Sequence, residues 1–320
     1  MESPVLLVVF NRPDTTIQVF EAIRKFKVPK LYISADAPRE GNLEDEIKCA
    51  EVRQIVQNVD WDCDVHYRFL EKNVGCGYGP SSAISWVLEK EDRVIILEDD
   101  CVPAQPFFTY CDYLLEKYKD DERVWLISGR SHHPQYHLFK KYDYIFSRFG
   151  HTWGWATWKR CWNNFDIEMS DLPLFLEENG FNNIFSNSKH SRYYSKKYFN
   201  LMQQKDLNTH AWDFQFGYII LKNSGLSIVP SNNLIHNIGS FGTHSSGESY
   251  AHKIPKNEEY QISSEPKFIM INKDYEDMHF KLHINPHQSI IKKIIRKVKK
   301  IKRYIQRRFV VININILNII

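Results

Sequence analysis

The sequence lacks an apolar run long enough to cross a membrane, because nothing in its 320 residues approaches the roughly 18 uninterrupted apolar residues of a spanning helix. Its first residues, MESPVLLVVFNRPD, have no basic region and reach Asn11 too early for a secretory signal, so we expect no signal peptide. The six cysteines are scattered without a CxxC pair, which favours reduced thiols in a cytosolic protein over disulfides or a zinc site.

Two glycine-rich nucleotide motifs are also absent. The sequence has no Gly-x-x-x-x-Gly-Lys-Ser/Thr, and the first turn from strand to helix has no Gly-x-Gly-x-x-Gly. These loops need glycine so that the backbone can approach phosphate closely. The sequence therefore argues against a P-loop protein and against a dinucleotide-binding Rossmann domain.

Acidic residues are missing from one basic segment near the end of the sequence. Ten Lys or Arg lie in residues 290–308, and without them the chain has 32 basic residues against 39 acidic ones, a net charge of −7. An acidic body argues against a nucleic-acid partner. Apolar residues recur along this segment at helical spacing, so we expect residues 289–320 to form a basic amphipathic helix on an anionic membrane surface, at the inner face of the cell membrane. Packing of this helix on its own domain or on a partner is the alternative.

Short apolar runs alternate with segments of helical periodicity. The predicted strands are Pro4–Phe10, Lys30–Ala35, Val65–Leu70, Val94–Leu97 and Val124–Ser128, and the predicted helices between them are Thr15–Phe26, Glu44–Val59 and Ser81–Leu88. This alternation predicts an α/β fold with a doubly wound, mostly parallel sheet flanked by helices.

Polar residues follow the predicted strands. Asn11 and Arg12 follow the first strand, Asp36 the second, and the triplet Glu98–Asp100 the fourth. In such a sheet these ends share one edge, where ligands bind. Adjacent carboxylates repel unless a cation neutralises them, and hard oxygen ligands suit Mn²⁺ or Mg²⁺. The alternative is a solvated helix N-terminus, where acids complement the helix dipole.

Several motifs, in order, resemble one family. PVLLVVFNRPDTT, LYISADAPR, DWDCDV, EKNVGCG, VIILEDDCVP, FGHTWGWATWKRCW, AWDFQF and VPSNNLIHNIG run from about Val5 to His244. They resemble nucleotide-sugar glycosyltransferases of the GT-A fold, in a bacterial group distantly similar to N-acetylglucosaminyltransferase I. The resemblance implies a nucleotide-sugar-binding and catalytic domain over residues 1–235, then a polar lid and extension over 236–288, before the tail.

The resemblance also implies roles for residues of the matching motifs. Asp100 would be the direct metal ligand, with Glu98 and Asp99 shaping the nucleotide-sugar site. Arg12 would contact the diphosphate. Asp36 would read the uracil ring, although Ala37 stands where the family often has glycine, so the turn can differ.

On the acceptor side the resemblance implies that Asp213 is the catalytic base and that Trp212 packs on the sugar. The segment HAWDFQFGYIILKNSG also predicts a helix that carries Asp213 in its first turn and stops at Gly225. Trp153, Gly154 and His151 are candidate sugar or acceptor contacts, and His244 lies in the predicted lid. Three tryptophans spaced three and four apart predict one buried helical face, and they are Trp155, Trp158 and Trp162.

These residues together predict a metal-dependent, inverting glycosyltransferase of the hexosyltransferase type, acting in bacterial surface polysaccharide synthesis. It would move a sugar from a UDP donor to a hydroxyl of a glycan or lipid-linked glycan. A sugar-1-phosphate nucleotidyltransferase is the alternative of another enzyme class, although NRPDTT lacks the glycines that it needs after the first strand. A non-catalytic membrane-surface binding protein on a transferase fold is the third possibility.

Overall fold

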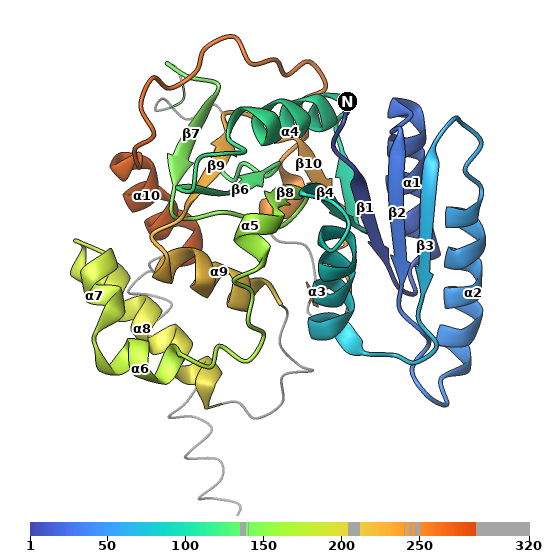
Figure 1. Ribbon diagram of the computed structural model, residues 1–320, viewed down its shortest axis with the longest axis horizontal. Coiled ribbons are helices and arrows are strands. Elements are labelled where there is room, and N and C mark those ends of the chain that lie inside the picture. The colour runs from blue at the N-terminus through green and yellow to red at the C-terminus, as the bar shows by residue number, and fades with distance from the viewer. Residues whose placement is uncertain are drawn as a thin grey trace, which may run out of the picture. The chain divides into compact units, whose positions relative to one another are not determined.

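An eight-stranded sheet forms the centre of the computed structural model (Figure 1). The structure describes residues 1–134, 139, 141–203, 212–239, 241–242, 245–246 and 250–285. The strands are β1 (Val5–Val9), β2 (Lys30–Ala35), β3 (Asp64–Phe69), β4 (Arg93–Glu98), β6 (Val124–Ser128), β7 (Tyr144–Ser147), β8 (Trp155–Trp158) and β9 (Leu226–Pro230). Their order across the sheet is β3-β2-β1-β4-β8-β6-β9-β7, which follows neither the sequence nor a simple meander.

Most of these strands run in one direction. β1 pairs in parallel with β2 and β4, and β2 with β3. β8 is antiparallel to both β4 and β6, so β6 again runs with β4, and β9 runs parallel to β6. β7 closes the edge as an antiparallel strand. The sheet is thus mostly parallel with two reversed strands, which confirms the predicted fold class.

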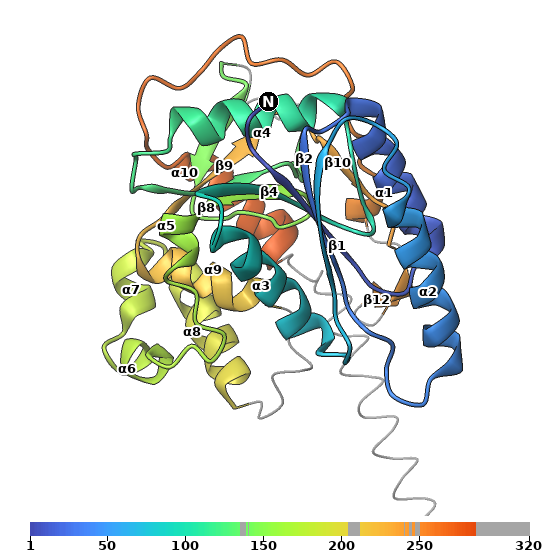
Figure 2. The same ribbon diagram turned by 45° about the vertical axis from the view of Figure 1, so that its right-hand side comes forward.

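Helices cover both faces of the sheet (Figures 1 and 2). On one face α1 (Pro13–Phe26) contacts α2 (Leu43–Gln57) and α4 (Gln105–Lys117). On the other, α3 (Gly75–Leu88) contacts β1, β2, β4 and α5 (Lys159–Trp162), and the Trp162 ring lies against Phe216 of α9 (Asp213–Lys222). This two-sided cover explains the nearly continuous apolar runs of β1, β4 and β6, which are buried on both faces.

The segment that begins at Trp155 corrects one prediction. Residues Trp155–Trp158 form the buried strand β8, and only Lys159–Trp162 are helical. A strand in the middle of a sheet is buried on both faces, so its short apolar run has the same composition as one face of a buried helix. Spacing alone could not separate the two, and the tryptophans pack on both sides of the sheet rather than on one helical face.

The remaining elements are short or lie beside the sheet. They are β5 (Cys101–Pro103), β10 (Ile235–Asn237), β11 (Phe241–Gly242), β12 (Ser245–Ser246), α6 (Leu172–Glu177), α7 (Gly180–Ile184), α8 (Ser188–Met202), the 3-10 helix Tyr250–Lys253, α10 (Lys273–His279) and the π-helical turn Phe280–Ile284. Residues Met1–Glu276 form one compact unit, and Asp277–Ile320 form a second unit that is described only to Asn285.

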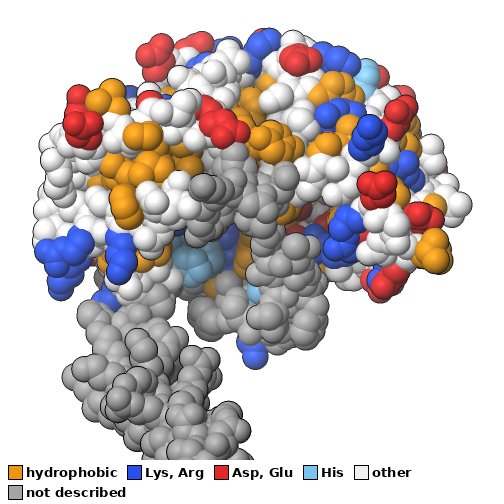
Figure 3. Space-filling model, turned by 90° about the horizontal axis from the view of Figure 1, so that it is seen from below, with side chains coloured by type: hydrophobic (Ala, Val, Ile, Leu, Met, Phe, Trp, Pro, Cys, Tyr) orange, Lys and Arg blue, Asp and Glu red, His pale blue; other side chains and the backbone are white. Residues whose placement is uncertain are grey.

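Charged side chains of both signs cover much of the described surface on the side of α1 and α2, whereas hydrophobic side chains gather on the side away from these helices (Figure 3). Exposed apolar residues on α6 and α8 include Leu174 and Phe199. No helix in the described part of the chain is both long and apolar enough to cross a membrane.

Candidate functional site

The carboxyl ends of four parallel strands meet at one edge of the sheet. These ends are Val9 of β1, Ala35 of β2, Glu98 of β4 and Ser128 of β6. The reversed strand β8 begins at the same edge, because Trp155 pairs with both Ile96 and Ser128. In doubly wound sheets this edge forms the ligand-binding crevice. The polar residues after β1, β2 and β4 therefore share one edge, as the sequence predicted.

Arg12 joins the last two acids after β4. Its Nη1 lies 2.8 Å from Asp100 Oδ2, and its Nη2 donates to Asp99 Oδ1. The backbone amide of Phe10 donates to the second oxygen of Asp99 at 3.2 Å. Asp99 and Asp100 are only 3% and 8% exposed. A largely buried cluster of one guanidinium and two carboxylates thus connects the end of β1 to the end of β4.

Ionisation of the acid triplet is unfavourable beside a single guanidinium. Burial raises the pKa of Glu98, and the carboxylates of Asp100, Asp99 and Asp213 raise it further. Burial also raises the pKa of Asp99, although the Arg12 guanidinium acts in the opposite direction. One guanidinium therefore does not neutralise the triplet, and the site favours a further cation.

A short ladder brings a distant segment to the acids. β5 pairs antiparallel with β10, and their register sets Asn237 opposite Cys101. The Asn237 side-chain amide donates to Asp100 Oδ1 at 3.1 Å. Gly239 lies so close that a Cβ on it would be 2.1 Å from Asp100 Oδ2. Sequence reasoning missed both residues, although both stand in the stretch HNIG.

Asp213 is the first residue of α9, which agrees with its predicted place in the first turn of a helix. Its carboxylate lies within electrostatic reach of Glu98. Burial raises the pKa of Cys76 on α3, and Glu98, Asp213 and Asp36 raise it further, so Cys76 is within electrostatic reach of these three acids. Lys197 on α8 was missed by sequence reasoning, and no motif contains it. Burial lowers the pKa of Lys197 whereas Asp213 raises it, and its Nζ lies 4.2 Å from the Phe214 ring centroid.

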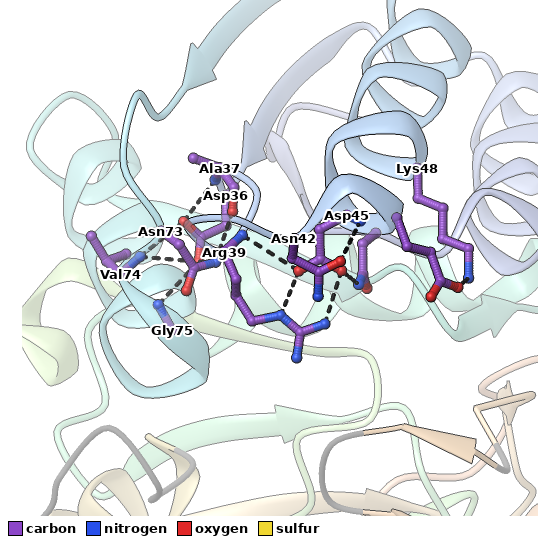
Figure 4. Close-up of polar contacts among 11 residues, drawn as sticks. Asp36, Ala37, Arg39, Asn42, Asp45, Lys48, Asn73, Val74 and Gly75 are labelled. Atoms are coloured by element: carbon purple, nitrogen blue, oxygen red, sulfur yellow. Dashed lines mark hydrogen bonds and ion pairs between the residues drawn. The ribbon is translucent and has the colours of Figure 1, made fainter.

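Asp36 follows β2 at the same edge, where its carboxylate is held by the chain itself (Figure 4). Its oxygens accept hydrogen bonds from the backbone amides of Ala37, Val74 and Gly75 and from the Asn73 side chain. Burial raises the pKa of Asp36, whereas the hydrogen bonds from the amides lower it, and the balance is upward. The residue therefore ties the end of β2 to the start of α3.

Trp153 lies at the start of the reversed strand among polar side chains. The Arg130 guanidinium carbon is 5.1 Å from its ring centroid, and the His132 ring is 6.2 Å away. His151 contacts His132, with ring centroids 4.0 Å apart. Arg130 is fully buried, so the Trp153 ring makes its cation–π contact with a guanidinium that the fold holds in place. The structure thus brings two of the predicted acceptor residues, Trp153 and His151, to one cluster.

Two other predicted acceptor residues have structural reasons of their own. Gly154 has φ +61°, and a Cβ on it would lie 2.3 Å from Ile235 Cδ1, so only glycine fits there. Trp212 is 3% exposed and stacks on Trp155 at 5.3 Å between ring centroids, which leaves almost no surface for a sugar. His244 and the predicted tail lie outside the described residues.

The donor set of the acid triplet fits a hard divalent cation such as Mn²⁺ or Mg²⁺. Such ions are held by one or two carboxylates and completed by water and substrate phosphates. Asp99 and Asp100 both accept hydrogen bonds from Arg12, and among the described residues the triplet does not form a cluster of three converging ligands. Asp100, the metal ligand that the resemblance implies, and Glu98 beside it are the carboxylates that would hold the ion.

No protein-family model and no curated protein matches the sequence. Similar solved structures include a UDP-glucose pyrophosphorylase complexed with UDP-glucose, with 9% identity and a TM-score of 0.26 over 45% of this chain and 62% of that one. HddC from Yersinia pseudotuberculosis is 10% identical with a TM-score of 0.31 over 53% of this chain and 85% of HddC. HddC complexed with GMP-PN is 8% identical with a TM-score of 0.29 over 49% of this chain and 78% of HddC.

The match to the pyrophosphorylase spans less than two thirds of that enzyme. None of these three structures is named as a glycosyltransferase, and overlaps of this size establish no activity for the present chain. Fold and site together define an α/β protein with a doubly wound sheet whose carboxyl edge carries a buried cluster of acids and arginine. The glycosyltransferase family and the residue roles that it implies stay predictions.

Proposed function

We propose that this chain is a metal-dependent, inverting glycosyltransferase that moves a hexosyl group from a UDP-sugar to a hydroxyl of a glycan or lipid-linked glycan. The observation that carries the proposal is the arrangement at the end of β4. A guanidinium and a cation-deficient acid triplet lie there within electrostatic reach of Asp213, at the carboxyl edge of a doubly wound sheet. This combination suits a ligand with a diphosphate on one side and a reacting hydroxyl on the other.

Each side of the site has a task in this reaction. Arg12 would bind the diphosphate as negative charge develops on the leaving group, a role that suits its planar, multiple donors. Asp213 would accept the proton of the attacking hydroxyl. A divalent ion held by Asp100 and Glu98 supplies Lewis-acid stabilisation of the leaving diphosphate when bound. A single base opposite the leaving group implies inversion at the anomeric carbon.

Trp153 and His151 would contact the acceptor or the transferred sugar. Support comes from their position at the start of β8, where the reversed strand meets the edge that also carries Glu98. Asp36 and Asp99 would serve the nucleotide-sugar side. The lid residue His244 and the anionic membrane partner are proposals from sequence, as is a location at the inner face of the cell membrane.

Sugar-1-phosphate nucleotidyl transfer is the second candidate. One of the three similar structures, the pyrophosphorylase, has this activity by name, and none of the three is named as a glycosyltransferase. Only three residues, Phe10 to Arg12, separate β1 from α1, and none is glycine. This short connection leaves little backbone to wrap a triphosphate, which is why we place nucleotidyl transfer second.

One assay separates the candidates. Purified protein is incubated with a panel of nucleotide sugars and Mn²⁺, with and without pyrophosphate. Glycosyl transfer or donor hydrolysis releases UDP and needs no pyrophosphate, whereas nucleotidyl transfer in reverse consumes pyrophosphate and forms UTP. We expect UDP release that is abolished by chelator and by Asp100→Ala. UTP formation would establish the second candidate, and neither product with any donor would favour a binding protein.

Asp213→Asn tests the base within the same assay. Removing a general base costs roughly two to four orders of magnitude in rate. Donor binding, measured by calorimetry, should stay close to that of the unchanged protein because the substitution does not alter the diphosphate side. A large loss of donor affinity with normal turnover would place Asp213 outside the acceptor side.

The basic segment 290–308 calls for a separate test. We expect removal of residues 289–320 to weaken binding to anionic liposomes and leave turnover of a soluble acceptor unchanged. Binding of the full chain should also fall steeply with salt, since charge attraction decays over roughly 10 Å at 0.1 M ionic strength. Equal sedimentation of both forms with liposomes would show that the segment serves another purpose.

A further inference from the structure

The carboxylate of Asp36 is fully engaged before any ligand is considered. Its Oδ1 accepts the amides of Ala37 at 2.8 Å and Val74 at 3.1 Å. Its Oδ2 accepts the Gly75 amide at 3.1 Å and the Asn73 side-chain amide at 3.2 Å. A carboxylate offers about four lone-pair positions, so these four donors use its capacity.

Helix α3 also lies against Asp36. Gly79 of α3 faces the same carboxylate, and a Cβ on it would lie 3.4 Å from Asp36 Oδ2. The Val74 and Gly75 amides begin α3 and have no intrahelical partner there, and the helix has no side-chain cap of its own. Asp36 thus caps α3 from a different part of the chain, as an N-cap residue does from within a helix.

Asp45 holds a neighbouring pair of loops in the same way (Figure 4). This residue of α2 is 2% exposed. It accepts the Asn11 side-chain amide at 2.7 Å and Arg39 Nη2 at 2.8 Å, while its own amide donates to Asn42 Oδ1 at 3.1 Å. Asn11 precedes Arg12, so Asp45 connects the loop after β1 to the loop after β2.

We propose that Asp36 and Asp45 are positioning residues that hold the loops after β1, β2 and β3 in one arrangement in the ligand-free protein, and that Asp36 does not read the nucleobase. The second half of this proposal rests on the proposed nucleotide-sugar function. The first half concerns the folded chain alone. Discrimination among nucleobases then comes from other groups, and Asp36 acts on nucleotide affinity through the backbone of residues 73–75.

The two roles of Asp36 predict different behaviour of Asp36→Asn. If Asp36 holds the loops, the NH₂ group of the new asparagine faces N–H donors that the carboxylate accepted. Residues 73–75 then lose these hydrogen bonds even without ligand. Nucleotide affinity then falls by a similar factor for every base. If Asp36 reads the base, the ligand-free loop keeps its protection and the preference among bases changes, because a donor replaces an acceptor.

Hydrogen exchange and calorimetry test these outcomes on the full chain. We expect Asp36→Asn to speed amide exchange at Val74 and Gly75 at least about tenfold without ligand. UDP, CDP and GDP should all bind more weakly by factors that agree within about threefold of one another. Unchanged exchange at both amides would overturn the proposal, and so would a loss confined to UDP.

Three further variants keep the test decisive. Asn73→Ala leaves Asp36 in place and removes the hydrogen bonds of the Asn73 side chain to Asp36 Oδ2 and to the Ala37 carbonyl. It should therefore speed amide exchange at residues 73–75 less than Asp36→Asn does. This variant keeps the test usable even if Asp36→Asn fails to fold. Asp45→Asn should raise exchange in residues 39–42 and weaken all three nucleotides. Glu44→Gln, an exposed neighbour of Asp45 on α2, is the control and should change neither measurement.

The exchange measurement is independent of the proposed function. If the unchanged protein binds none of the nucleotides, the nucleotide-sugar function fails, while the exchange of Val74 and Gly75 still decides whether Asp36 holds the loop. Unchanged exchange in all three variants, Asp36→Asn, Asn73→Ala and Asp45→Asn, would refute the positioning role whatever the nucleotide affinities are.

Discussion

Replacing Arg12 by methionine should destabilise the protein in a pH-dependent way. Arg12 is the cation that the described structure pairs with Asp99 and Asp100, and methionine keeps a similar length without the charge. The two carboxylates are 3% and 8% exposed, so they would remain largely buried with their guanidinium partner removed. Leaving a buried charge without its partner is among the costliest single changes in a folded protein.

The expected loss of stability in Arg12→Met follows from the burial of the two carboxylates and the partial exposure of Arg12. Breaking a buried ion pair by removing one partner costs about 3–5 kcal/mol. The Arg12 side chain is 31% exposed, so water screens part of the interaction and we expect about 2–4 kcal/mol. At about 2–4 °C per kcal/mol for a domain of this size, the Tm should fall by roughly 5–15 °C near pH 8.

The sign of the pH dependence follows from Asp99. Burial raises its pKa in the folded protein, and an acid with a raised folded-state pKa costs stability as the pH rises through that value. Removing Arg12 raises the pKa of Asp99 further. The loss caused by Arg12→Met should therefore be smaller at pH 5, where protonation removes the buried charge of Asp99, and largest at pH 8.

Thermal unfolding followed by circular dichroism, in chelator at pH 5, 6.5 and 8, measures this difference. Arg24→Met is the matched control, because Arg24 pairs with Glu21 and Asp60 on the surface, where it is 43% exposed. The control should show little change at any pH. An equal Tm loss at pH 5 and pH 8, or a loss no larger than that of the control, would refute the reasoning.

Three other substitutions test separate parts of the structure. Gly239→Ala should lower the free energy of unfolding by about 1–3 kcal/mol and weaken Mn²⁺ binding measured by calorimetry, because the new Cβ would lie 2.1 Å from Asp100 Oδ2. The control is Gly217→Ala in α9, where the new Cβ would meet only Tyr198 Oη at 3.4 Å. This control should be neutral or slightly stabilising. Lys197→Met should move the acid side of the pH–rate profile to higher pH, because Lys197 favours the ionised form of Asp213, while Lys197→Arg should not. Glu276→Ala should lower the free energy of unfolding, measured by chemical denaturation, by about 3–5 kcal/mol. Glu276 is 1% exposed and accepts hydrogen bonds from the Arg148 backbone amide at 2.6 Å and from the Arg148 guanidinium. A change near zero would contradict the burial of this pair.

Local patterns were sufficient for the elements that build the binding edge. The apolar run Val94–Leu97 predicted β4 within one residue at each end, and the predicted place of Asp213 in the first turn of a helix was also correct. Both signals are contained in a few neighbouring residues. The alternation of strands and helices then determined which strand ends share an edge, because parallel strands place their carboxyl ends together.

Long-range pairing limited what the sequence could reveal. Asn237 reaches Asp100 only because β10 pairs with β5, and the two residues are 137 positions apart. Lys197 lies beside Asp213 because α8 packs on the first turn of α9, where Tyr198 Oη donates to the Phe214 carbonyl at 3.0 Å. Asn237 stands in the motif VPSNNLIHNIG, but neither contact leaves a pattern in the sequence that identifies the partner residue, so only the folded chain shows them.

Arg12 and Asp36 show how far a predicted role depends on partners that a sequence does not show. Both lie at the predicted edge, yet the chain itself engages both. An arginine carries five N–H donors, and Arg12 uses Nη1 and Nη2 for one carboxylate each, so donors remain for a diphosphate without breaking the cluster. A carboxylate has fewer positions, and those of Asp36 are filled by four donors from the chain. The same edge therefore leaves Arg12 able to contact a ligand directly and restricts Asp36 to an indirect effect through residues 73–75.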